Sequence, residues 1–238
     1  MKNYILKVLC IAAFMFGTGS IAQAQFRQSI FLDGVLPVGS FASSASKSDV
    51  PFTMEHMGKE AIIGFGAGYR VSYRFDVGMG EVAPFAQVDL FWNTIDGNWK
   101  EKFAGHKYST PNYFNVPLLA GVSYLYDELW NDITLFAEFG LGGDFFFITP
   151  EGTGKGNERF AYKPTVELAW MVGAGAYFGQ HVSAGLYYYG LGKHYIDYTD
   201  KTISNNNVAA IQAAVYSLNN SRESRNIGEL ALRIGFHF

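Results

Sequence analysis

The stretch that decides the fold is Leu-Ala-Leu-Arg-Ile-Gly-Phe-His-Phe, residues 230–238. Every second residue of it is apolar, namely Leu230, Leu232, Ile234, Phe236 and Phe238. The residues between them are small or polar, namely Ala231, Arg233, Gly235 and His237. Successive side chains of a β-strand point to opposite faces, so an extended chain separates these two sets, whereas a helix would mix them. The stretch is therefore predicted to be a strand with one apolar face and one small or charged face.

The same alternation recurs along the chain and predicts eight strands. We expect them at about residues 27–38, 62–75, 81–94, 113–126, 133–147, 165–178, 182–195 and 227–238. The small and polar face of the second segment would carry Gly64, Gly66, Gly68 and Arg70. Lys193 would lie on the corresponding face of the seventh segment. An antiparallel up-and-down arrangement of eight such strands is the simplest all-β fold that these segments allow.

The connections between these segments alternate in length. Short connections lie at residues 76–80, 127–132 and 179–181, and long ones at residues 39–60, 96–112, 149–161 and 197–225. Three short turns and four long loops are what an even-numbered barrel requires when both ends of the chain lie on the same side. We therefore expect one barrel domain over residues 25–238 and no second domain.

The first 24 residues are expected to be a signal peptide that is removed. Lys2 and Lys7 form a basic start, a short apolar run follows, and Ala22-Gln23-Ala24 fits the small-x-small cleavage pattern. The chain's single cysteine, Cys10, lies in this segment. The mature chain would then have no thiol for a disulfide, a nucleophile or a cysteine-based metal site.

Composition narrows the class of protein further. Without Lys2 and Lys7, 16 of the 18 basic residues remain against 21 acidic ones, a formal charge of −5 that disfavours nucleic-acid binding. Charged residues make up 16% of the chain, below the roughly one quarter usual in soluble domains, and aromatic residues make up 17%. No run of about 20 apolar residues is present to form a transmembrane helix. A transmembrane β-barrel satisfies all three observations.

The period of two does not say which face points outward, because a soluble lipocalin-like barrel would place the apolar face inside. The polar face is rich in glycine, which suits a crowded and curved lumen better than a solvated exterior. Aromatic residues also gather near the strand ends of the apolar face, as in the girdles of membrane barrels. The expected girdle is Tyr73, Phe75, Tyr124, Tyr126 and Phe178 at one rim and Trp92, Phe114, Phe145 and Phe147 at the other.

The chain resembles the small outer-membrane β-barrel proteins, that is, the porin-family or OmpA/OmpX-like barrels. The features that carry the resemblance are the signal peptide, the eight strands, the alternating loops and the closing residues 230–238. The resemblance covers the whole mature chain and rests on pattern. It implies the outer membrane of a Gram-negative bacterium, contact with outer-membrane lipid, and long loops that face the extracellular side. It also implies that the barrel assembly machinery reads Phe236 and Phe238 as an assembly signal.

Charged side chains on the polar face form the main candidate site. The expected lumen charge cluster is Asp33, Arg70, Arg74, Asp89, Glu138, Glu167, Glu229 and Arg233, with Asp144 on the same face. Unpaired charges would be costly there, so they should pair across strands, and closure of the barrel would bring Asp33 near Arg70 or Arg233. Such a cluster predicts a structural plug; a gated ion or solute path and a catalytic carboxylate pair are the alternatives.

Other motifs carry weaker signals. The five histidines, His56, His106, His181, His194 and His237, have no metal-ligand spacing, so no metal and no cofactor are expected. Gly152, Gly154, Lys155 and Gly156 lack the spacing of a phosphate-binding loop. The polar loop 197–225 and the aromatic residues Trp99, Phe103 and Tyr108 are the expected surfaces for an extracellular ligand.

We therefore expect a non-enzymatic outer-membrane barrel with a structural or surface-binding role. A narrow channel for small solutes or ions is the first alternative, although eight strands leave little open bore. A lipid A-modifying enzyme is the second alternative, and it would require a serine–histidine pair at the outer rim.

Overall fold

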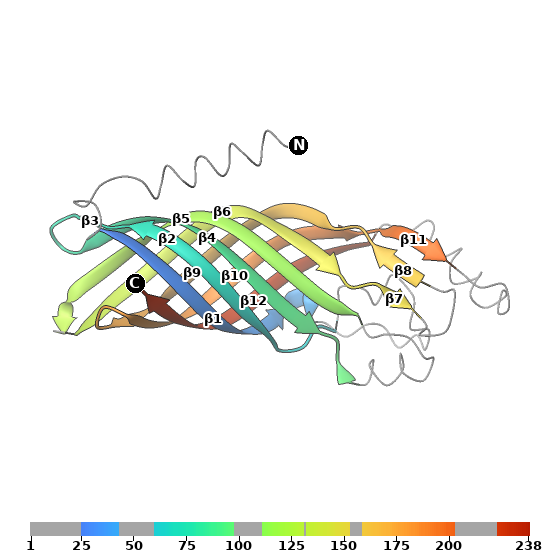
Figure 1. Ribbon diagram of the computed structural model, residues 1–238, viewed down its shortest axis with the longest axis horizontal. Helices are drawn as coiled ribbons and strands as arrows, with labels where there is room; N and C mark the ends of the chain where they lie inside the picture. The colour runs from blue at the N-terminus through green and yellow to red at the C-terminus, as the bar shows by residue number, and fades with distance from the viewer. Residues whose placement is uncertain (1–24, 43–59, 98–110, 131, 153–158, 203–222) are drawn as a thin grey trace.

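A computed structural model describes residues 25–42, 60–97, 111–130, 132–152, 159–202 and 223–238. The eight predicted strands are confirmed, and they form a single closed barrel (Figure 1). The barrel strands are β1 (Phe26–Val38), β2 (Gly64–Tyr73), β4 (Glu81–Thr94), β5 (Asn112–Trp130), β6 (Ile133–Ile148), β9 (Thr165–Phe178), β10 (Val182–Ile196) and β12 (Glu223–His237). The expected signal peptide, residues 1–24, lies outside the described residues.

Every barrel strand pairs antiparallel with its two neighbours, and the first strand closes on the last. β1 pairs with β12 in a register that sets Asp33 opposite Arg233, and β2 pairs with β4 so that no edge strand remains. The final residue takes part in the closure, because Phe238 and Gln28 exchange two backbone hydrogen bonds of 3.0 Å. Closure satisfies the edge hydrogen bonds that an open sheet would leave unpaired.

The outer surface of the barrel is apolar, whereas the buried charged side chains in its wall point inward, where they lie among buried aromatic and aliphatic residues. Leu32, Leu168 and Leu232 are 57%, 71% and 64% exposed, whereas the charged side chains of Asp33 and Arg233 are buried. A soluble barrel would show the reverse distribution. The exposed apolar band therefore faces hydrocarbon, and the protein is a transmembrane barrel of the bacterial outer membrane. Among the residues that the structure describes, no helix is both long and apolar enough to cross a bilayer.

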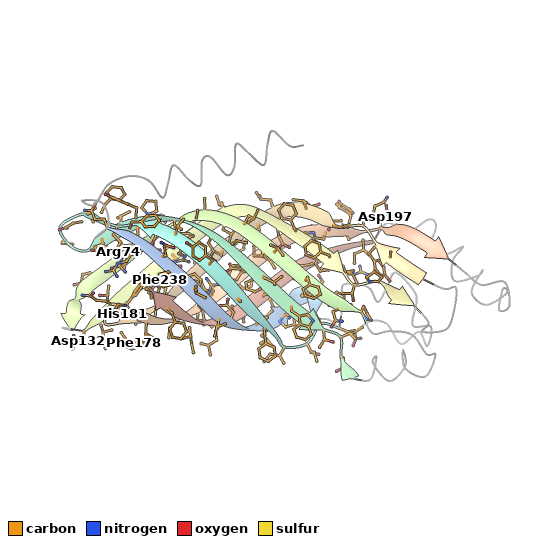
Figure 2. All side chains as sticks on the ribbon, in the orientation of Figure 1. Arg74, Asp132, Phe178, His181, Asp197 and Phe238 are labelled. Atoms are coloured by element: carbon orange, nitrogen blue, oxygen red, sulfur yellow. The ribbon has the colours of Figure 1, made fainter. Side chains whose placement is uncertain are left out.

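Short turns and long connections lie at opposite ends of the barrel (Figures 1 and 2). Figure 2 labels Arg74, Phe178, His181 and Phe238 at the end with the short turns, and Asp197 at the other end. The short strand β3 (Phe75–Asp76) extends the β2–β4 hairpin. At the long-loop end, β7 (Glu151–Gly152), β8 (Arg159–Tyr162) and β11 (Tyr198–Thr202) form a separate three-stranded sheet. Two of the long connections are therefore joined to each other beyond the barrel.

Two predictions about the inner face need correction. The lumen was expected to hold small and charged residues, but Phe31, Phe91 and Phe146 also point inward and are fully buried. An eight-stranded lumen has to be filled by side chains, and glycine and carboxylates alone leave it underpacked. Lys193 was expected to face the lumen, yet it is exposed on the outer surface, because β10 contains a bulge that reverses its alternation.

Candidate functional site in the barrel lumen

The centre of the lumen is crossed by a network of buried ion pairs. The guanidinium group of Arg233 donates to both carboxylate oxygens of Asp33, from Nε at 2.7 Å and from Nη2 at 2.9 Å. The same Nη2 also donates to Oδ1 of Asp89 on β4 at 2.9 Å. The first interaction follows directly from the register, because Asp33 and Arg233 are cross-strand partners. Two-pronged contact between a guanidinium and a carboxylate is the strongest form of protein ion pair.

A second arginine, Arg70, completes the network from β2, two strands away from β12. Arg70 on β2 donates from Nη1 and Nη2 to the two oxygens of Glu138 on β6, each at 2.6 Å. β4 and β5 separate these two strands, so the pair spans the lumen. Gln87 joins the two halves, because its Oε1 accepts from Nε of Arg70 at 2.8 Å and its Nε2 donates to Asp89. The side chains of Gln87 and of the five charged residues are buried and hydrogen-bonded, which removes much of the cost of burying the charges.

Small and aromatic neighbours make room for these charges. A β-carbon added to Gly68 would lie 2.0 Å from Oδ1 of Asp89, so that position must lack a side chain. The guanidinium carbon of Arg233 lies 4.3 Å from the ring centre of Phe31, and that of Arg70 lies 4.1 Å from the ring centre of Phe85. Both distances suit cation–π contacts, so inward-pointing rings replace part of the water that the arginines lose.

Above the network, towards the long loops, the lumen holds two further buried acids, Glu229 and Asp144, and the buried Arg225 of β12. Glu229 accepts a hydrogen bond of 3.2 Å from Asn115 across the lumen, while its second oxygen and Asn115 Oδ1 have no partner among the described residues. Nε2 of His194 lies 3.2 Å from Asp144 but 2.7 Å from the carbonyl of Leu191. The charges at this level are therefore less well satisfied than those in the centre.

An aromatic plug closes the lumen at the long-loop end. The 3₁₀ turn η1 (Gly39–Phe41) follows β1 and inserts the fully buried ring of Phe41 between two rings of the barrel wall. The ring centre of Phe41 lies 5.4 Å from that of Tyr113 and 6.3 Å from that of Phe146, and both pairs pack edge to face. Sequence reasoning missed this plug, because Phe41 lies in a connection where no strand periodicity marks it.

At the short-turn end, a histidine lies between two serines. Nδ1 of His237 lies 2.7 Å from Oγ of Ser29, and Nε2 lies 2.7 Å from Oγ of Ser183. This histidine is buried, and no described carboxylate hydrogen-bonds to its ring. The second histidine contact, Nδ1 of His194 to Oγ1 of Thr165 at 2.8 Å, lies at the other end of the lumen. Sequence periodicity alone did not bring the partners of His237 together, because Ser29 and Ser183 lie 208 and 54 positions away in the chain.

The structure divides the expected charge cluster into groups. Asp33, Arg70, Asp89, Glu138 and Arg233 share the central network, and of the two partners expected for Asp33 the bonded one is Arg233. Arg74 lies apart, near the short-turn end, where it pairs with Glu81 at 3.0 Å. Glu229 lies above the network, where it contacts Asn115, and Glu167 on β9 is only half-buried.

The expected girdle residues lie on the outer face at both ends of the strands. At the short-turn end, the rings of Tyr73 and Phe75 are 4.8 Å apart, and Tyr124 donates to the backbone of Met79 at 2.8 Å. At the long-loop end, the rings of Trp92 and Phe114 stack 6.5 Å apart. The remaining girdle positions are exposed or half-buried, namely Tyr126, Phe145, Phe147 and Phe178. Phe236 and Phe238 also face outward, at 47% and 58% exposure.

Nothing in the described part of the chain has the composition of a metal centre. No group of three or more histidine, cysteine, aspartate or glutamate side chains is placed there to hold a metal ion.

No protein-family model matches this chain, and no curated protein matches it either. Several solved structures are similar to it. A major outer membrane protein from Thermus thermophilus is 14% identical, with a TM-score of 0.49, over 90% of this chain and 99% of that one. Neisserial surface protein A is 11% identical, with a TM-score of 0.43, over 89% and 95% of the two chains. The outer membrane enzyme PagL is 12% identical, with a TM-score of 0.40, over 88% and 98%.

These similarities concern the fold alone. One of the three proteins is an enzyme, and the other two are a surface protein and an outer membrane protein. At such low identity, they do not indicate what this chain binds or whether it catalyses a reaction.

Proposed function

We propose that this protein is a closed, non-enzymatic scaffold of the outer membrane whose barrel holds extracellular loops for binding at the cell surface. The observation that carries the proposal is the double obstruction of the lumen. The Arg70–Glu138 pair crosses it at the centre, and Phe41 fills it at the long-loop end. A barrel that served for diffusion would instead need a continuous water-filled path.

The joined loops support the surface-binding part of the proposal. β8 and β11 come from different long connections and pair with each other outside the barrel. Lys163 and Asp197 reinforce the junction, because the backbone N–H of Lys163 donates to the carbonyl of Asp197 at 2.9 Å. Rigid presentation of loops on a barrel lowers the entropy that a binding surface loses when it contacts a partner.

Neither His194 nor His237, the two buried histidines that the structure describes, supports the enzymatic alternative. Both ring nitrogens of His237 are engaged by serines inside the short-turn end of the barrel, not at the outer rim. His194 is fully buried, and its ring contacts Thr165 and the carbonyl of Leu191. A general base has to reach the substrate proton, and neither ring is placed on an exposed surface where it could do so.

Conductance in planar bilayers tests the closed-scaffold proposal. The full-length mature barrel should give no stepwise current, and Phe41→Ala should remain silent because the central ion pairs still block the lumen. The combined change Phe41→Ala, Arg70→Ala and Arg233→Ala removes the ring and both arginines of the central network, and it should produce small channel steps. Steps from the unaltered barrel would overturn the proposal in favour of a narrow channel.

Loop replacement tests the surface-binding part. Cells that carry the barrel with residues 203–222 replaced by a short Gly-Ser linker would be compared with cells that carry the unaltered protein. The replacement should abolish attachment to immobilised host-cell or bacterial-cell surfaces while leaving the level of folded barrel unchanged. Equal attachment of the two strains would exclude this loop as the binding surface.

A further inference from the structure

A β-bulge in β10 places a lysine on the lipid-facing side of the barrel. Gly190 pairs with Gly228 of β12, and three residues later Lys193 pairs with Asn226, so β10 contains one residue more than its partner. Gly192 provides the positive φ of 94° at this point. As a result, Leu191 and His194 both point into the lumen with no exposed area, whereas Lys193 points outward. Regular alternation would have placed Lys193 inside with Leu191.

An aromatic shelf, formed by Trp170 and Tyr188, lies on the short-turn side of this lysine, at the level of Gly190. Trp170 of β9 is the cross-strand partner of Gly190, and its indole covers that glycine: a β-carbon there would lie 2.3 Å from Nε1. The ring centre of Trp170 lies 5.3 Å from that of Tyr188, the next outward residue of β10 before Gly190. Trp170 is 39% exposed, so part of the indole remains open to the surroundings.

Lys193 is not charge-paired within the part of the chain that the structure describes. Its cross-strand partner Asn226 is uncharged. Lys163 differs, because its Nζ contacts Asp197 at 2.8 Å. A lysine at the edge of an apolar band extends its charge towards the headgroups while its alkyl chain lies along the apolar surface.

We propose that Lys193, Trp170 and Tyr188 form a lysine–aromatic site for a phosphorylated glycolipid of the surrounding leaflet. The order of groups along the strands matches the order of groups in such a lipid. Leu186 and Val172, 59% and 47% exposed, each lie two residues nearer the short turns than Tyr188 and Trp170 and provide the surface for acyl chains. The rings of Trp170 and Tyr188 would pack against the C–H face of a sugar ring. The ammonium group of Lys193, further towards the long loops, would pair with a phosphate on that sugar. A phospholipid lacks the sugar that would use the aromatic shelf.

The site requires only that the barrel lie in a bilayer, so it stands independently of the proposed surface-binding role. Native mass spectrometry of the full-length mature barrel, with diphosphorylated lipid A added in detergent, measures its occupancy. Lys193→Gln should weaken binding about fivefold to tenfold, the loss expected for one lysine–phosphate contact. Lys193→Arg should retain binding, and Lys163→Gln, a matched control whose charge is already paired, should leave it unchanged.

Three comparisons make the outcome decisive. The unaltered barrel should bind the dephosphorylated glycolipid and phosphatidylglycerol more weakly than diphosphorylated lipid A, and Trp170→Leu should reduce its preference for lipid A over phosphatidylglycerol. Unchanged binding by Lys193→Gln would overturn the site. Equal binding of phosphatidylglycerol and lipid A by the unaltered barrel would overturn its assignment to a glycolipid. Because Lys193 is exposed, the variant should fold normally, which the shift in gel mobility between unheated and heated samples verifies.

Discussion

Replacing Arg233 by alanine should destabilise the barrel by about 3–5 kcal/mol, the usual cost of removing one partner from a buried ion pair. The structure places the effect at the upper part of this range. Arg233 makes three hydrogen bonds to two carboxylates, and the alanine variant leaves both Asp33 and Asp89 buried without that cation. Neither carboxylate can turn to solvent, because both side chains lie in the filled centre of the lumen.

The free energy of unfolding can be measured by urea titration of the barrel in lipid vesicles, with tryptophan fluorescence as the signal and linear extrapolation to water. Arg233→Lys is the matched control: it keeps the charge but loses the two-pronged geometry, so it should cost about 1–3 kcal/mol. The double variant Asp33→Asn with Arg233→Ala should be less destabilised than the sum of the single variants, because the two residues interact directly.

Two results would refute this reasoning. If Arg233→Ala unfolds at the same urea concentration as the unaltered barrel, the central network contributes nothing to stability. If the two single changes are additive in the double variant, Arg233 and Asp33 are not coupled. Either result would mean that water, rather than the guanidinium group, balances the carboxylate of Asp33.

The remaining predictions use the same unfolding measurement. Gly142→Ala should destabilise the barrel by about 2 kcal/mol or more, because the added β-carbon would lie 1.8 Å from the carbonyl oxygen of Leu118. Gly143→Ala should change the stability little, because the nearest atom to its added β-carbon would lie 3.6 Å away. Equal effects of the two substitutions would contradict this packing. Glu229→Gln should leave stability unchanged or raise it by about 1 kcal/mol, because it removes a buried charge whose second oxygen lacks a described partner, and a clear loss would contradict this. Ile234→Arg, in the middle of the lipid-facing band, should lower the free energy of unfolding by about 2–4 kcal/mol. Asn226→Arg, beyond that band, should lower it by only about 0–1 kcal/mol. The reverse order would place the membrane elsewhere on the barrel.

Much of the central network could be predicted from the sequence, because inward and outward positions follow from local alternation. Asp33, Arg70, Asp89, Glu138 and Arg233 all fall on the polar face of their segments, and the structure brings them together. Alternation could not say which acid each arginine would bind. Arg70 reaches Glu138 across two intervening strands, and that contact depends on the diameter of the barrel and the stagger of its strands.

Other features escaped the sequence for identifiable reasons. The bulge at Gly192 shifts the alternation by one residue, so the pattern that succeeded elsewhere placed Lys193 on the wrong face. Phe41 lies in a connection, where side-chain direction depends on how the loop folds back over the lumen. His237 and its two serine partners come from β12, β1 and β10, and no local signal relates them.

The sequence by itself determined that this chain is an eight-stranded barrel with apolar side chains outside and charges inside. A period of two is a local property of an extended chain, and the composition of each face shows whether it contacts lipid or the lumen. The tertiary structure alone decided which charges pair and how the lumen is closed. Asp33 and Arg233 lie 200 positions apart in the chain, and only closure of the first strand on the last makes them neighbours.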